Sequence, residues 1–226
     1  MDFRRRNLKM NKEWSALNKA MQLQLKKKET FADGVQTLFA LRKTLMETLL
    51  CLKTDLSRKD FDAIPFINAD GFHSKTIAYS IWHIFRIEDI VAHTLICDDQ
   101  EIFFSEHYKE RINSPIITTG NELAKQEIAD FSAKLNLEEL YSYAQKVKES
   151  TEKILIGLSF DDLKRKISAE RKIKLENLNV VSTDERAIWL IDYWCNKDIR
   201  GLIQMPFSRH WIMHVEAILR IKKKIR

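Results

Sequence analysis

Residues 73–97 read HSKTIAYSIWHIFRIEDIVAHTLIC, and apolar side chains cover nearly every side of the helix that this pattern predicts. The apolar positions are Ile77, Ile81, Ile84, Phe85, Ile87, Ile90, Val91 and Leu95. A helix that is apolar all round lies in the interior of a protein. We therefore expect a buried helix with other helices packed around it.

Apolar spacings of three and four predict further amphipathic helices on both sides of this segment. They cover about residues 30–56, 121–158, 182–196 and 207–225. The second of these ranges shows the pattern of a fresh helix start at Asn136. Residues 1–29 predict a basic helical extension that precedes a domain over residues 30–226. Four long helices with buried faces favour an antiparallel four-helix bundle.

Composition agrees with an all-α fold. The chain has only 5 glycines and 3 prolines among 226 residues, where these two types together typically supply roughly 12%. Tight hairpins between strands need such residues. The three cysteines are far apart and form no CxxC pair, which argues against a disulfide framework and predicts a reducing, cytoplasmic setting. We expect no secretory signal and no membrane span, since no apolar run approaches about 18 residues.

The net charge of +6 comes from 38 basic and 32 acidic residues. Nucleic-acid binding needs basic residues gathered on one face together with groups that read or stack on bases, and the sequence shows no such pattern. A DNA-associated protein stays an alternative on the basis of this charge. Steeply salt-sensitive retention on DNA would identify it.

His210 and His214 carry the clearest chemical signal. Four residues apart, they stand one turn above each other, about 40° apart on the helical wheel. The apolar residues Phe207, Ile218 and Ile221 share their side, and charged residues occupy the opposite one. Both imidazoles therefore face the predicted core, where unpartnered polar groups are costly. A divalent metal ion could satisfy both at once.

His83 is placed in the same way on the buried segment. Tyr79, Ile87 and Ile90 all lie within about 40° of it on the wheel, whereas His93 lies about 80° away. A hydrogen-bonded core histidine is the alternative for His83 taken alone. Together with His210 and His214, the sequence predicts a three-histidine metal site.

Three neutral imidazoles leave coordination positions open, which is typical of a catalytic rather than a structural site. The HWIMH sequence lacks the glutamate that follows the first histidine of zinc proteases. Glu88 and Asp89 lie on other sides of the helix from His83, so the catalytic residues remain unknown. Cys97 and Cys195 have no neighbours that would lower a thiol pKa, and we do not expect them to be nucleophiles.

Tyr79, Trp82 and Trp211 lie beside or close to the predicted ligands and are candidates for lining a pocket. The alternative for each is a place in the core. Metal ligands must be deprotonated, and free histidine has a pKa near 6.5. On this basis metal occupancy is expected to decline through roughly pH 6 to 5.

The chain resembles the DinB family over about residues 30–226. The matching motifs are His83-x-x-Arg86-x-Glu88-Asp89 on the buried helix and His210-x-x-x-His214 near the start of the last helix. This resemblance implies a four-helix bundle with long crossover connections, and a divalent ion, zinc or nickel, held by the three histidines. Val215-Glu216 follows the last histidine where many relatives carry Gly-Gln, which leaves the subfamily and its substrate open.

The resemblance further implies a metal-dependent enzyme that acts on a small molecule. Some relatives are thiol-dependent S-transferases that join a low-molecular-weight thiol to an electrophile, and the metal would lower the pKa of that thiol. The alternatives are a non-catalytic metal-binding helical protein and, on the family's historical name together with the charge, a DNA-associated damage-response protein. The oligomeric state stays open, with a homodimer as one candidate.

Overall fold

Every element is helical in the computed structural model, which describes residues 3–69 and 71–226. Within these ranges the β-type pairing is limited to one isolated bridge between Lys166 and Asp198. The all-α prediction is confirmed. No helix of the described ranges has the length and apolar character that crossing a membrane requires. Residues 1 and 2 of the expected extension lie outside the described residues.

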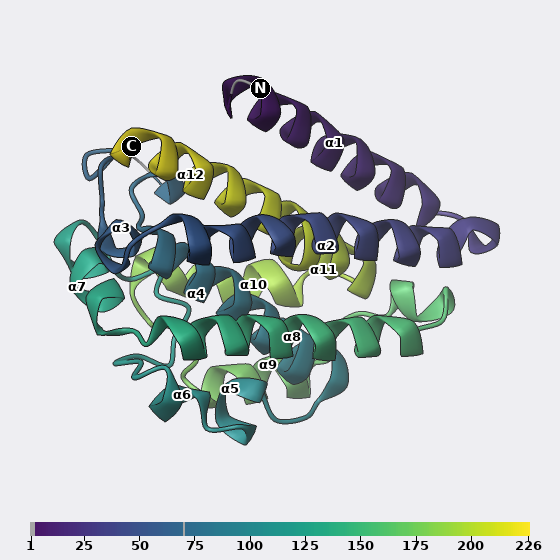
Figure 1. Ribbon diagram of the computed structural model, residues 1–226. Helices are drawn as coiled ribbons and strands as arrows, with labels where there is room; N and C mark the ends of the chain where they lie inside the picture. Colours follow the sequence, from purple (N-terminus) through teal and green to yellow (C-terminus); the bar gives the residue numbers. More distant parts are fainter. Residues whose placement is uncertain (1–2, 70) are drawn as a thin grey trace.

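Four helices, labelled in Figure 1, contact one another in a closed cycle. Helix α2 (Phe31–Asp55) contacts α8 (Leu137–Gly157), α8 contacts α4 (Ile77–Asp89), α4 contacts α12 (His210–Ile225), and α12 contacts α2. All residues of α4 are buried. The prediction that this segment is an interior helix is confirmed.

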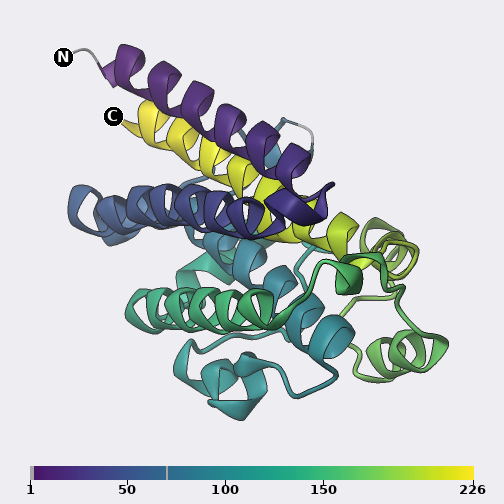
Figure 2. The ribbon, with the colours of Figure 1, turned by 90° about the vertical axis from the view of Figure 1, so that its right-hand side faces the viewer.

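Helix α1 (Phe3–Gln24) lies against α2 and alongside α12 (Figure 2). Its Trp14 is 1% exposed and belongs to the same hydrophobic cluster as α4 and α12. The face of α12 that points away from α4 is therefore covered in part by the N-terminal helix.

Shorter helices connect these long ones. They are η1 (Lys28–Thr30), α3 (Arg58–Asp62), η2 (Gly71–His73), α5 (Ile102–Ser105), α6 (Tyr108–Arg111), α7 (Gln126–Lys134), η4 (Asp161–Lys164), α9 (Ala169–Asn177), α10 (Glu185–Cys195) and α11 (Ile199–Gln204). The expected restart within residues 121–158 is confirmed, because Asn136 caps α8 by accepting hydrogen bonds from its first backbone N–H groups.

Several expected helices differ from the structure at their ends, and the one expected from residue 121 begins only at Gln126, as α7. The buried segment begins at Ile77, where the Thr76 hydroxyl caps α4, and it continues as the π-helix η3 (Ile90–Cys97). The last segment starts with the π-helix η5 (Met205–Arg209) before α12 begins at His210. Side-chain periodicity does not distinguish π from α geometry, and π turns are frequent at functional sites.

Candidate metal centre

His83 from α4 and His210 and His214 from α12 converge in the core. One ring nitrogen of each lies within 4.8 Å of those of the other two. The ring centroids are 5.0 Å apart for His83 and His210, 4.8 Å for His83 and His214, and 4.5 Å for His210 and His214. The predicted convergence of these three side chains is confirmed.

The π-helix η5 sets the position from which α12 starts. The Ser208 hydroxyl donates to the carbonyl of Ile203 across this wide turn at 3.1 Å. The Phe207 carbonyl accepts a hydrogen bond from Arg42 of α2 at 3.1 Å. Because His210 is the first residue of α12, these two contacts fix where its imidazole enters the core.

A backbone carbonyl orients His83. Its Nδ1 lies 2.7 Å from the carbonyl oxygen of Thr119, and a carbonyl can only accept, so Nδ1 carries the proton. The Nε2 atom of a neutral His83 then keeps its lone pair. Metal-ligating histidines almost always donate their second N–H to such an acceptor. This contact is the outer-shell support that a metal ligand requires.

The loop that supplies this carbonyl is held on the other side by Tyr79. Its hydroxyl donates to the carbonyl of Gly120 at 2.8 Å, and its ring stacks on His83 with 5.4 Å between centroids and 14° between planes. Gly120 has a φ of +75°, a conformation that glycine adopts without strain. Tyr79 and Gly120 thus fix the carbonyl that orients His83.

All three imidazoles are neutral near pH 7. Burial lowers the pKa of His83 to about 4. Burial also lowers the pKa of His210 and of His214 well below the ordinary value, and the neighbouring imidazoles lower both further. Neutral imidazole is the form that binds a metal ion.

The site has the donor set for a borderline divalent ion. Imidazole nitrogen suits zinc and nickel, and tetrahedral zinc places ligand nitrogens about 3.4 Å from one another. The three nitrogens, which lie within 4.8 Å of one another, would have to move closer together to reach that spacing. Within the described residues, the buried Nδ1 of His210 makes no hydrogen bond, and an unpartnered polar atom is costly to bury. A cation bound through this nitrogen would offset that cost.

The three aromatic candidates have different surroundings. Tyr79 contacts His83 directly, as described above. The ring of Trp82 packs against Phe103 and Phe131 with centroids 5.2 and 5.6 Å away. Trp211 packs edge-on against Phe85 at 4.6 Å. Tyr79 is thus the candidate that the structure brings to the three histidines.

The sequence did not predict a buried ion pair that lies close to the site, between Arg42 of α2 and Glu88 of α4. Arg42 donates to both carboxylate oxygens of Glu88 at 2.9 and 2.7 Å, and the indole N–H of Trp211 donates to the same carboxylate at 2.7 Å. The side chains of Arg42 and Glu88 are both 0% exposed. Since Trp211 neighbours His210, this ion pair positions the first turn of α12. Only the burial of a charged residue in an apolar helix pattern hinted at it.

Asp89 stabilises the fold and does not contact the three-histidine cluster. Its carboxylate accepts hydrogen bonds from the backbone N–H groups of Ile102 and Phe103, at 2.9 Å each, and from the Tyr143 hydroxyl at 2.8 Å. Both acidic residues of the predicted motif therefore have partners away from His83, as the helical wheel predicts.

The remaining histidines lie apart from the three. His93 holds the end of η3, because its ring nitrogens contact Asp99 at 2.7 Å and Ser150 at 3.0 Å. His73 accepts from Arg220 at the surface, and His107 lies in a connection between short helices. Burial raises the pKa of the Cys195 thiol to about 11, which agrees with its predicted inertness.

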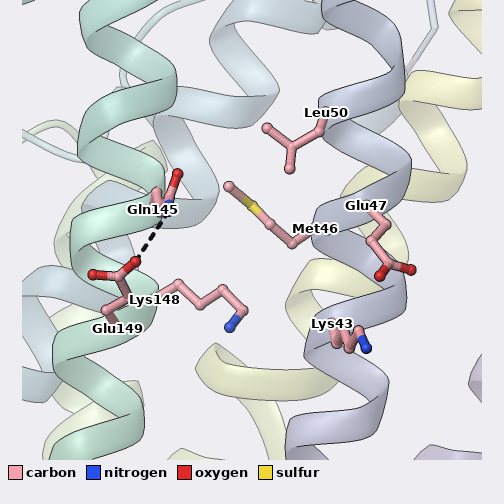
Figure 3. A pocket seen from close by; sticks show the side chains of 7 residues that line it. All are labelled: Lys43, Met46, Glu47, Leu50, Gln145, Lys148 and Glu149. Atoms are coloured by element: carbon pink, nitrogen blue, oxygen red, sulfur yellow. Dashed lines mark hydrogen bonds between the residues drawn. The ribbon is translucent and has the colours of Figure 1, made fainter.

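Two surface cavities lie away from the histidines. A cavity of about 180 Å³ between α2 and α8 is lined by Met46, Leu50 and charged side chains that include Lys43 and Lys148 (Figure 3). A larger one of about 560 Å³ lies among α1, α2 and α12. Neither is lined by a residue of the three-histidine cluster.

Neither a protein-family model nor a curated protein matches this chain. The resemblance to the DinB family therefore rests on the histidine motifs and their places in the helices.

Proposed function

We propose that His83, His210 and His214 bind one divalent ion, zinc or nickel, and that the protein is a metal-dependent enzyme of the DinB type acting on a small molecule. The observation that carries this proposal is the convergence of three buried, neutral imidazoles from α4 and α12. The outer-shell contact from Thr119 to His83 supports it.

The reaction that suits this site best is thiol-dependent S-transfer. A bound divalent ion lowers the pKa of a thiol and yields thiolate at neutral pH. Three protein ligands leave at least one coordination position for that thiol. The ring of α2, α4, α8 and α12 fits a DinB-type four-helix bundle with long connections. The three free cysteines suit a cytoplasmic setting.

Elemental analysis of protein purified without a histidine tag tests the metal proposal. We expect about one zinc or nickel ion per chain, as in other three-histidine sites, and none in the double variant His210→Ala/His214→Ala. Circular dichroism should show that this variant keeps its helices. His107→Ala removes a histidine distant from the cluster and should keep the ion. Full occupancy in the double variant would overturn the proposal.

One observation favours a second candidate, a non-catalytic metal-binding protein. His83, His210 and His214 are only 5%, 8% and 4% exposed, which leaves little room for a substrate beside the ion. Cobalt(II) separates the two candidates, because a thiolate bound to it gives an intense charge-transfer band. An enzyme with an open position should give this band with β-mercaptoethanol, whereas a closed structural site should not.

A further inference from the structure

Three side chains stack on one another where the chain leads into α4: Lys75, Tyr79 and His83. Tyr79 and His83 are i and i+4 neighbours on α4, and Lys75 lies just before the cap residue Thr76, outside the helix. The Lys75 ammonium lies over the Tyr79 ring, 4.8 Å from its centroid, and the same ring stacks on His83 at 5.4 Å. A cation is thus placed one aromatic ring away from the predicted metal ligand.

We propose that Lys75 binds an anionic group, such as a carboxylate, on the small molecule that reaches the metal centre. This inference rests on the proposed function and deepens it by naming the charge of the substrate. The thiol or its acceptor would carry a negative group, which the ammonium binds while the reacting atom lies at the three histidines.

The partners of Lys75 support this role. Its side chain is half-buried and lies against the Tyr79 ring. No carboxylate in the described part of the chain forms an ion pair with it. A partly buried ammonium without a counter-ion is costly. An anionic ligand would supply the missing counter-ion and form a charge-assisted hydrogen bond.

The surrounding charges leave Lys75 as the available cation. The charge of Arg186 lowers the pKa of Lys75. The guanidinium of Arg186, however, already forms an ion pair with the carboxylate of Asp184 at 2.8 Å. The charge of Glu122 raises the pKa of Tyr79. One carboxylate oxygen of Glu122 accepts a hydrogen bond from the Thr118 hydroxyl. Lys75 is close enough to lower the pKa of both His83 and His214. Burial, with Arg186, lowers its own pKa to about 8, so it remains mainly protonated at pH 7.

Two thiols that differ in charge test the proposal on cobalt(II)-loaded protein. Mercaptopropionate carries a carboxylate and mercaptopropanol a neutral hydroxyl in its place, and the thiolate–cobalt band reports binding of each without any turnover. We expect wild-type protein to bind mercaptopropionate about tenfold more tightly, the size of one charge-assisted contact. Lys75→Met should remove this preference and Lys75→Arg should retain it. Lys43→Met, on the distant face between α2 and α8, should leave it unchanged.

The outcomes separate the two proposals. Equal affinity of wild-type protein for both thiols, or a preference that survives in Lys75→Met, overturns the role of Lys75 and leaves the metal centre intact. Wild-type protein that fails to bind cobalt(II), or binds it without any thiolate band, overturns the thiol-binding metal centre, and the role of Lys75 falls with it. Cobalt binding by Lys75→Met itself shows that the variant is folded at the site.

Discussion

Burial sets the protonation state of the three histidines, and this has a measurable consequence. The pKa of His83 is about 4 in the folded protein, whereas in the unfolded chain it is near 6.5. The unfolded state therefore takes up protons first as the pH falls. For His83 the loss of stability sets in as the pH falls below about 6.5 and continues to about pH 4. His210 and His214, whose pKa burial also holds well below the ordinary value, destabilise the folded state in the same direction as the pH falls.

We expect the metal-free protein to lose up to about 1.4 kcal/mol of unfolding free energy per pH unit for each histidine in this range. Urea unfolding of metal-free protein at pH 8, 6 and 5 measures the slope. The variant His210→Gln/His214→Gln should show a shallower slope, since it lacks two of the three groups. A free energy that does not vary over this range would contradict the depressed pKa values.

The ion pair of Arg42 and Glu88 gives a second prediction about single residues. Arg42→Met leaves a buried carboxylate whose remaining partner is the Trp211 indole, and breaking a buried pair costs about 3–5 kcal/mol. We expect a loss of this size in urea unfolding. Arg42→Met/Glu88→Gln should recover much of it, because a neutral amide oxygen can still accept from the indole N–H. If the single and double variants are equally stable, the buried charge is not what destabilises the single variant.

Among the elements, those defined by local periodicity were predictable and those defined by backbone geometry were not. The wheel placed His210 and His214 on one side of α12 because i and i+4 neighbours share a face. It did not predict η3 or η5, since a π turn changes hydrogen bonding while keeping the same apolar residues. Nor could it predict that the Thr119 carbonyl lies against His83, because a carbonyl is common to all residues and has no sequence signature.

The loop at Gly120 supports a prediction at the level of elements. A Cβ at Gly120 would lie 3.0 Å from a ring carbon of Tyr79, at a φ of +75°. Gly120→Ala should therefore displace the loop and weaken the Thr119 contact with His83. Loss of an outer-shell partner typically lowers metal affinity about 10- to 100-fold. Competition with a chromophoric chelator measures this change.

Gly157 at the end of α8 provides the matched control. A Cβ there meets nothing within 4 Å, and alanine is favoured over glycine in a helix. We expect Gly157→Ala to keep full metal affinity and to be at least as stable as the wild type. Equal affinity in both variants would show that the Gly120 loop does not support the metal ligands.

In the whole molecule, the candidate site depends on helices that are distant in sequence. The inward faces of α4 and α12 could be predicted separately from their apolar patterns. Their contact, and therefore the approach of His83 to His210 and His214, depends on how the ring of helices packs. The same holds for Arg42 of α2, whose charge gave no sign that it pairs with Glu88. Pairings of this kind depend on tertiary distances, which local periodicity does not encode.

A metal ion bound to His83, His210 and His214 would join α4 to α12 across the core, and binding only the folded state stabilises it. An ion at about 100 times its Kd adds about 2.7 kcal/mol, which for a chain of this size raises Tm by roughly 5–10 °C.

The pKa of a free histidine predicts that this stabilisation by the metal shrinks between pH 6 and 5. The lowered pKa of His83, about 4, instead predicts that metal-loaded and metal-free protein differ nearly as much at pH 5.5 as at pH 8. Calorimetry of both forms at the two pH values measures the difference, with His210→Ala/His214→Ala as the control that should show none. A gain that vanishes by pH 5.5 would mean that these imidazoles titrate like exposed ones.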